Sequence, residues 1–302
     1  MSEKIYDINI YHERCSDGIA SAWVCQRFNP SIHLISCIAG KNPMIIPVDC
    51  IGKKIIFTDI CPSTEYLEEL CKYAEKVTIL DHHVTAYQKI EGWKTKPDNL
   101  FTIFVNNQSG CMITWDYFYP GEEMPFFIQY IGDRDLWKWE LPYSKEINEV
   151  LFVDNYITFE GLTKLDNPIK YSSLISLIKR GEELLTEKKI LIQRGIESAK
   201  ECKFVMEEKT YGIWLYTGLD DLRSDIGSEL TKKTLKNGCL PDFCVHWRYN
   251  ISTNEFWLSM RSTDELTDVS KICQKYGGGG HRNASGCTLP PHLLPRDIFH
   301  FH

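Results

Sequence analysis

The stretch Val77–His83 constrains the fold of this chain more than any other. Residues Val77–Leu80 are apolar or β-branched and predict a short buried strand, which ends in Asp81, His82 and His83. Carboxylate oxygens and imidazole nitrogens are ligands that suit Mn, Fe or Zn, and strand ends direct such side chains into a shared crevice. We interpret the stretch as part of a metal site; the alternative is a capped turn that carries a surface histidine.

Two other predicted strands end in the same kinds of residue. Ile5–Tyr11 runs into the polar segment His12–Gly18, after which Ile19–Phe28 has helical spacing, and Lys54–Thr58 ends at Asp59. A simple helix N-cap is the alternative interpretation of the first polar segment. Because helices separate these strands, the pattern predicts an α/β fold with a doubly wound, mostly parallel sheet whose acids gather at its C-terminal edge.

A fourth candidate source of ligands lies further along the chain. The apolar run Phe126–Ile131 is followed by Asp133, Arg134 and Asp135. The alternative interpretation is an ion-pair cluster at the surface.

The second half of the chain predicts a separate lobe. Residues 167–200 have helical spacing over a length of roughly 45 Å at 1.5 Å per residue, which suits a connector. We therefore predict a catalytic domain at 1–160, a helical connector at 161–202 and a smaller α/β domain at 203–302.

This second lobe contains four consecutive glycines. Gly277–Gly280 would expose backbone N–H groups, and the adjoining His281 and Arg282 add donors, so the segment predicts a loop that cradles an anion. A flexible linker is the alternative, although helical and strand signals flank the glycines.

Composition limits the kinds of partner. The chain has 302 residues, 43% of them hydrophobic and 25% charged, with a net charge of −7, so it lacks the excess of basic residues that extended duplex binding needs. Short single strands, dinucleotides or nucleotides are favoured. No segment approaches about 18 apolar residues, and the 12 cysteines show no C-x-x-C spacing. We expect a cytoplasmic protein with reduced thiols and no membrane partner.

Acids and histidines at four element ends suffice to hold two divalent cations. Such a pair activates water and stabilises the attacking and leaving oxygens of phosphoryl displacement. A glycine-rich and arginine-containing lobe would orient the phosphate. The sequence therefore predicts a metal-dependent hydrolase of phosphoesters.

These motifs resemble those of a known family. Asp81–His83 is similar to the signature of the DHH phosphoesterases, and Gly277–Gly286 is similar to the glycine-rich motif of their associated C-terminal domain. The remaining motifs follow in matching order, so the resemblance covers nearly the whole chain. It implies two Mn²⁺ ions, which Mg²⁺ or Co²⁺ can replace, and a phosphoester substrate.

The resemblance also implies roles for individual residues. The metal ligands would be His12, Asp17, Asp59, Asp81, His82 and Asp133, with Asp59 the expected bridge. His83 would support the ligands or face the substrate, so that the implied catalytic set is Asp59, Asp81, His82 and His83. The residues that would hold the substrate phosphate are Arg261, Ser262, Gly279, Gly280, His281 and Arg282.

The chain departs from the family pattern near its first motif. Many members have a further acid close to the first Asp-Gly, where this chain has Cys15. Either Cys15 is a ligand, which would favour softer metals such as Zn²⁺, or the first metal has an extra water. Asp135 is the alternative to Asp133.

Several functions are compatible with these motifs. The leading prediction is a phosphodiesterase or exonuclease that acts on short oligonucleotides or dinucleotides. The alternatives are a phosphatase of 3′-phosphorylated nucleotides or inorganic polyphosphate, a catalytically weak nucleotide-binding regulator, and a structural protein with incidental acids.

Overall fold

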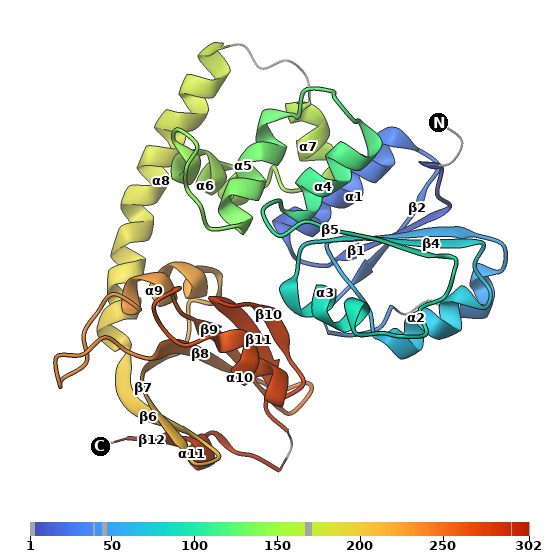
Figure 1. Cartoon of the computed structure of the whole chain (residues 1–302). Coiled ribbons are helices and arrows are strands. Elements are labelled where there is room, and N and C mark those ends of the chain that lie inside the picture. Colours follow the sequence, from blue (N-terminus) through green and yellow to red (C-terminus); the bar gives the residue numbers. More distant parts are fainter. Residues whose placement is uncertain (1–3, 39, 44–46, 167–170, 291, 302) are drawn as a thin grey trace. The chain divides into compact units, whose positions relative to one another are not determined.

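A computed structural model describes residues 4–38, 40–43, 47–166, 171–290 and 292–301. The chain forms two compact units, an N-terminal unit of residues 1–185 and a C-terminal unit of residues 186–302 (Figure 1). The division falls inside helix α8 (Tyr171–Ser198), within the predicted connector. The first residues of the predicted helix, 167–170, lie outside the described residues. The predicted domain boundaries at 160 and 202 stay predictions.

The N-terminal unit is built on a parallel sheet. Among the described residues its five strands lie in the order β2-β1-β3-β4-β5, and every pair is parallel. The α/β prediction of a doubly wound parallel sheet is thus confirmed. The strands are β1 (Ile8–His12), β2 (His33–Cys37), β3 (Lys54–Thr58), β4 (Lys76–Asp81) and β5 (Leu100–Phe104).

Helices cover both faces of this sheet. Successive side chains of a strand point to opposite faces of the sheet. Ile56 therefore packs in one apolar cluster with Trp23, and Phe57 packs in a second cluster with Leu67. In Figure 1, α1 and α4 lie on one side of the sheet and α2 and α3 on the other. The helical segments are α1 (Ser16–Phe28), η2 (Pro47–Cys50), α2 (Thr64–Cys71), α3 (Val84–Glu91), α4 (Gly110–Phe118), α5 (Phe126–Asp135), α6 (Ser144–Val153) and α7 (Phe159–Leu165).

The strand order creates a switch point beside β1. The chain leaves β1 toward β2 on one side and then crosses to β3 on the other side. Ligands of open α/β sheets bind at the carboxyl ends of the strands at such a point, because the loops diverge there and leave a crevice. Tyr11 pairs with Thr58, so the residues that follow them, His12 and Asp59, begin the two diverging loops.

The C-terminal unit has a different sheet. In the described part its seven strands lie in the order β10-β11-β9-β8-β7-β6-β12, and β7 and β8 form the parallel pair of an otherwise antiparallel sheet. The strands are β6 (Lys200–Met206), β7 (Lys209–Tyr216), β8 (Phe243–Asn250), β9 (Glu255–Arg261), β10 (Gly279–His281), β11 (Ala284–Thr288) and β12 (Phe299–His300). Its other helical segments are η3 (Asp220–Leu222), α9 (Arg223–Leu230), α10 (Val269–Lys275) and α11 (Pro295–Ile298). No helix in the described ranges of either unit is both long and apolar enough to span a membrane.

The glycine-rich segment is only in part the loop that the sequence predicts, since Gly277 and Gly278 lie outside any strand. Gly279 and Gly280 belong to β10, which pairs antiparallel with β11. A Cβ atom at Gly278 would lie 2.1 Å from the carbonyl oxygen of Gly286, and Gly280 has a φ of +134°. Both positions therefore require glycine, because β10 and β11 approach too closely for a side chain.

Candidate metal centre

The ends of β1 and β3 bring a histidine and an aspartate together. His12 Nδ1 lies 3.3 Å from Asp59 Oδ2. Asp59 is 1% exposed and has a φ of 58°, a left-handed conformation that is rare for residues other than glycine. Its backbone N–H donates to Leu80 O at 2.9 Å, which holds this strained residue in place. Strain of this kind typically marks a functional position.

His82 joins the same carboxylate to two further acids. Its Nε2 lies 3.3 Å from Asp59 Oδ1. The same nitrogen lies 3.4 Å from Asp135 Oδ2 and 3.7 Å from Asp17 Oδ2. Asp59 therefore presents one oxygen toward His12 and the other toward His82, as a ligand shared by two cations would.

Asp17 is fixed by the start of helix α4. Its two carboxylate oxygens accept hydrogen bonds from the backbone N–H groups of Gly110 at 2.6 Å and Cys111 at 2.8 Å. A Cβ atom at Gly110 would lie 2.6 Å from Asp59 Cβ. Gly110 thus allows α4 to approach both acids. Gly110 was not among the predicted site residues.

Asp81 orients the histidines that follow it. Its Oδ1 accepts a hydrogen bond from the backbone N–H of His82 at 2.7 Å and lies 2.6 Å from His83 Nδ1. Its Oδ2 is buried and has no hydrogen-bond partner among the described residues. An unsatisfied buried carboxylate oxygen is costly unless a cation or another donor occupies the site.

The structure places Asp135, rather than Asp133, in this centre. The buried carboxylate of Asp133 accepts hydrogen bonds from Glu140 N at 3.0 Å and from Ser144 Oγ, so it holds the segment that leads into α6. The two acids lie two residues apart near the end of helix α5, where about 200° of rotation separates them. One therefore faces the centre and the other faces away. The implied role of Asp133 as a ligand does not fit this geometry, and the alternative Asp135 does.

Crowding of acids and histidines shifts their pKa values. Burial, together with the negative charge of Asp59, raises the pKa of the Asp17 carboxyl group well above its ordinary value, and burial also raises that of Asp135. Burial opposes the charge on Asp59, but its pairs with His12 and His82 outweigh that effect and lower its pKa.

The pKa values of the histidines rise because carboxylates surround them. Burial alone would lower both, yet the neighbouring carboxylates raise the pKa of His82 to about 10 and that of His83 to about 9. The carboxylates of the centre thus strongly favour a positive charge beside them.

The donor atoms fit divalent cations. Among the described residues of the N-terminal unit, three groups have ligand atoms within 4.8 Å of one another: Asp17, His82 and Asp135; Asp59, Asp81, His82 and His83; and His12, Cys15 and Asp59. Oxygen and imidazole nitrogen donors suit Mn²⁺, Fe²⁺ and Zn²⁺, and a thiol adds a softer donor. The mutual proximity and burial of these donors are what a metal centre requires.

The residues predicted to bind phosphate lie in the C-terminal unit and have contacts within it. The half-buried Arg261 guanidinium donates to Met260 O at 2.8 Å and to Ser224 Oγ at 2.7 Å. Arg282 donates to the carbonyl oxygens of Asp264 and Leu266 at 3.0 and 3.1 Å. Both guanidinium groups therefore form hydrogen bonds within the C-terminal unit.

The other members of that predicted set lie close to these arginines. Ser262 donates its backbone N–H to Asn283 O at 2.9 Å, next to Arg282. Gly279, Gly280 and His281 form β10. Phosphate binding by this set stays a prediction.

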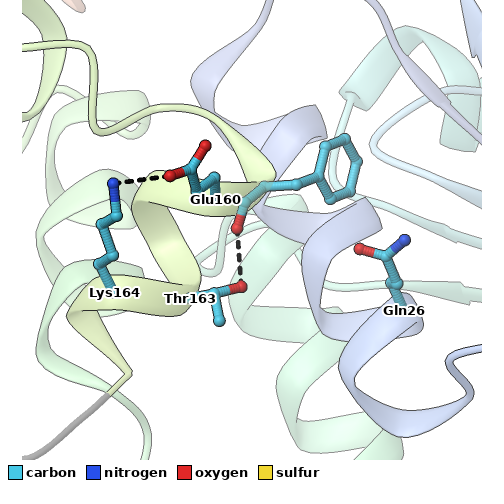
Figure 2. A pocket seen from close by; sticks show the side chains of 5 residues that line it. Gln26, Glu160, Thr163 and Lys164 are labelled. Atoms are coloured by element: carbon cyan, nitrogen blue, oxygen red, sulfur yellow. Dashed lines mark hydrogen bonds and ion pairs between the residues drawn. The ribbon is translucent and has the colours of Figure 1, made fainter.

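A separate hollow lies between α1 and α7 (Figure 2). Its polar side chains already interact within α7: Glu160 pairs with Lys164 at 2.7 Å, and Thr163 Oγ1 donates to Phe159 O at 2.7 Å. The hollow contains none of the predicted site residues, and it takes no part in the metal centre.

Comparisons with known proteins agree with this fold. The chain is 30% identical over 298 residues to uncharacterized protein R106 of Acanthamoeba polyphaga mimivirus, which covers 94% of this chain and 67% of that protein. It is 25% identical over 248 residues to oligoribonuclease NrnB of Bacillus subtilis (strain 168), which covers 78% of this chain and 59% of NrnB. The chain therefore spans only about six to seven tenths of these relatives.

A solved structure shares the fold. The crystal structure of RecJ from Thermus thermophilus in complex with Mn²⁺ matches with a TM-score of 0.51 and 12% identity, over 96% of this chain and 50% of RecJ. No family model matches the chain.

A doubly wound unit with an Asp-His-His centre, joined to a second unit with a glycine-rich strand pair, defines a class of hydrolases that act on phosphoester bonds. The chain belongs to one family with protein R106, and its motifs together with these comparisons point to the DHH phosphoesterases.

Proposed function

We propose that this protein is a two-metal phosphodiesterase that releases nucleotides from short single-stranded oligonucleotides or dinucleotides. The observation that carries the proposal is the position of Asp59. Its two oxygens lie 3.3 Å from His12 Nδ1 and 3.3 Å from His82 Nε2, so one carboxylate serves two groups of donors. A carboxylate shared in this way is suited to hold two cations close together, as in-line displacement at phosphorus requires.

Each residue of the centre has a defined part in this function. One cation would be held by Asp59 with His12, and the other by Asp59 with His82, Asp17 and Asp135. Bound cations would supply Lewis acidity and a water of lowered pKa. The α4 backbone N–H groups fix Asp17, and Asp81 fixes the His83 ring beside the cluster. The protein thus fixes the ligands before the substrate arrives, which reduces the reorganisation needed during the reaction.

Charge and relatives favour a short substrate. A net charge of −7 opposes binding of a long polyanion. One relative is named an oligoribonuclease, and the RecJ structure that shares the fold contains Mn²⁺. We therefore choose RNA dinucleotides as the first substrate and Mn²⁺ as the first metal to test, with Mg²⁺ and Co²⁺ as the next metals.

The test is hydrolysis of a 5′-labelled RNA dinucleotide by EDTA-treated protein with and without added Mn²⁺, resolved by product length. The expected result is mononucleotide release that requires the metal and is lost in Asp59→Asn and Asp81→Asn. The matched control is Asp116→Asn, since Asp116 is an exposed acid of α4 that pairs with Gln108 outside the centre.

Two results would overturn the proposal. The first is turnover that persists after removal of the metal. The second is the absence of turnover on dinucleotides and on single strands of several lengths, by protein that has bound metal. In the second case, phosphate release from a 3′-phosphorylated nucleotide or from polyphosphate would identify a phosphatase instead.

A further inference from the structure

The donor group beside His12 contains a thiol. Sγ of Cys15, a ring nitrogen of His12 and a carboxylate oxygen of Asp59 all lie within 4.8 Å of one another. The Asp59 carboxylate is buried, with its Oδ2 3.3 Å from His12 Nδ1 and its Oδ1 facing His82. Nitrogen, sulfur and oxygen donors thus meet at one position beside a buried carboxylate.

The fold places Cys15 there by close packing at the start of α1. A Cβ atom at Gly18 would lie 2.3 Å from the carbonyl oxygen of His12, so glycine lets the first turn of α1 contact the end of β1. Arg14 has a φ of 58°, which turns the chain sharply between the strand and the helix. Cys15 is the N-cap residue of α1, yet its side chain accepts no capping hydrogen bond. The thiol is therefore positioned by the fold at the end of β1, beside His12.

We propose that Cys15 is a ligand of one of the two cations, and that this position prefers a thiophilic divalent ion such as Zn²⁺, Co²⁺ or Fe²⁺ over Mg²⁺. This inference rests on the proposed two-metal function. Cysteine, histidine and aspartate are established zinc donors, and three protein ligands leave a coordination position for water or substrate. Thiolate is a soft ligand, whereas Mg²⁺ prefers oxygen alone. On binding, the Cys15 S–H proton passes to solvent and the S–metal bond replaces the S–H bond.

Cobalt provides the direct test. Co²⁺ is titrated into metal-free full-length protein while the absorption spectrum is recorded, because a thiolate ligand produces a sulfur-to-cobalt charge-transfer band in the near ultraviolet. The expected result is this band together with visible d–d bands in the wild type. In Cys15→Ser the charge-transfer band disappears and Zn²⁺ affinity falls by more than about 100-fold, since even partners outside the ligand shell are worth 10–100-fold.

Two further variants separate a ligand from a structural residue. Cys61→Ser is the matched control: Cys61 is half-buried, follows Asp59 by two residues, and belongs to no donor group found among the described residues. It should keep the band. Cys15→Asp supplies an oxygen donor at the same place, so it should lose the band and bind Mg²⁺ and Mn²⁺ more tightly than the wild type.

The outcomes distinguish the two proposals. If the wild type binds Co²⁺ with visible bands but without charge transfer, or if the band survives in Cys15→Ser, the thiolate ligand is excluded and the two-metal function stands. If the wild type binds neither Co²⁺ nor Mn²⁺, the proposed function itself is overturned. Circular dichroism and thermal unfolding of each variant verify that it is folded.

Discussion

The two units both contain charged side chains at their predicted sites but use them differently. In the N-terminal unit, Asp59, Asp81 and His82 converge at one sheet edge and leave buried carboxylate oxygens without hydrogen-bond donors. In the C-terminal unit, Arg261 and Arg282 are also charged, yet their guanidinium groups donate to oxygens of the same unit. The first unit concentrates buried carboxylates, whereas the second satisfies the guanidinium groups of these two arginines internally, and its buried atom without a hydrogen-bond partner among the described residues is the amide Oδ1 of Asn283.

This difference teaches how to distinguish a site from a scaffold. A buried polar group that lacks a partner costs free energy, so it persists where a ligand or substrate supplies that partner. A satisfied group stabilises the fold whether or not a ligand is present. The following predictions test this contrast, beginning with the largest expected effect.

Asp135 and Asp133 provide the sharpest contrast. Asp135→Asn removes a charged donor beside His82, so metal-dependent turnover should fall by about 10²–10³-fold, which corresponds to about 3–4 kcal/mol of transition-state stabilisation. Asp133→Asn should instead lower the free energy of unfolding by about 2–3 kcal/mol, because it weakens hydrogen bonds to a charged group. Steady-state kinetics and urea denaturation of both variants provide the measurement.

The opposite pattern would show that Asp133 is the ligand. In that case Asp133→Asn would abolish turnover at unchanged stability, and Asp135→Asn would leave turnover intact.

Glycine-to-alanine changes test the close contacts of each unit. Gly110→Ala places a Cβ atom 2.6 Å from Asp59 Cβ, and Gly278→Ala places one 2.1 Å from Gly286 O. Each should destabilise the protein by about 1–3 kcal/mol through overpacking. Only Gly110→Ala should also weaken Mn²⁺ binding, measured by calorimetry, since it displaces a donor of the centre.

Gly92 is the control for this pair. It has a helical φ of −72° at the end of α3, and an added Cβ atom would lie 3.2 Å from Gln88 O, so Gly92→Ala should change stability only slightly. Equal loss of Mn²⁺ affinity in Gly110→Ala and Gly278→Ala would contradict the separation of roles.

Arg282 tests whether the C-terminal unit also contains an unsatisfied charge. Its guanidinium donates to Asp264 O and Leu266 O but is partly exposed, so Arg282→Ala should cost only about 1 kcal/mol of stability. The KM for a dinucleotide should change by less than about twofold. A tenfold rise in KM at unchanged stability would instead identify the phosphate contact that the family resemblance implies.

His246 should have the smallest effect. Burial lowers its pKa, while Gly218 O and Asp220 partly offset that effect. The unfolded chain therefore binds the proton more readily, and this residue should reduce stability as the pH falls below the unfolded value of about 6.5.

The contribution of His246 to the free energy of unfolding changes by at most about 1.4 kcal/mol per pH unit. His246→Gln should flatten the dependence of the unfolding free energy on pH between neutrality and mild acid. His33→Gln, which changes an exposed histidine of β2, is the control. If the unfolding free energy of the wild type and of His246→Gln depends on pH with a similar slope, other groups cause the loss of stability in acid.

Much of the N-terminal unit could be predicted from the sequence. Strand β3 begins and ends at the predicted residues, and the acids that follow β3 and end β4 lie together, because parallel strands place their carboxyl ends at one edge. The role of Gly110 could not be predicted, because it depends on how closely α4 approaches Asp17 and Asp59.

The C-terminal unit was less predictable. The run Gly277–Gly280 signals a special backbone, but a loop that binds an anion and a strand pair that packs closely both require glycine. The structure shows the pairing of β10 with β11, between residues three to seven positions apart in the chain, and anion binding by this segment stays a prediction.

The sequence alone determined that this chain has an α/β fold with strand ends rich in acids and histidines, and that it resembles the DHH phosphoesterases. The fold class and the strand ends follow from local periodicity, which neighbouring residues specify, whereas the resemblance rests on the motifs Asp81–His83 and Gly277–Gly286. Tertiary structure alone decided that Asp135 faces the centre while Asp133 faces α6, that Asp59 serves two donor groups, and that Cys15 lies beside His12. The direction in which a side chain points depends on helix phase and on packing between distant segments, and no local pattern specifies either.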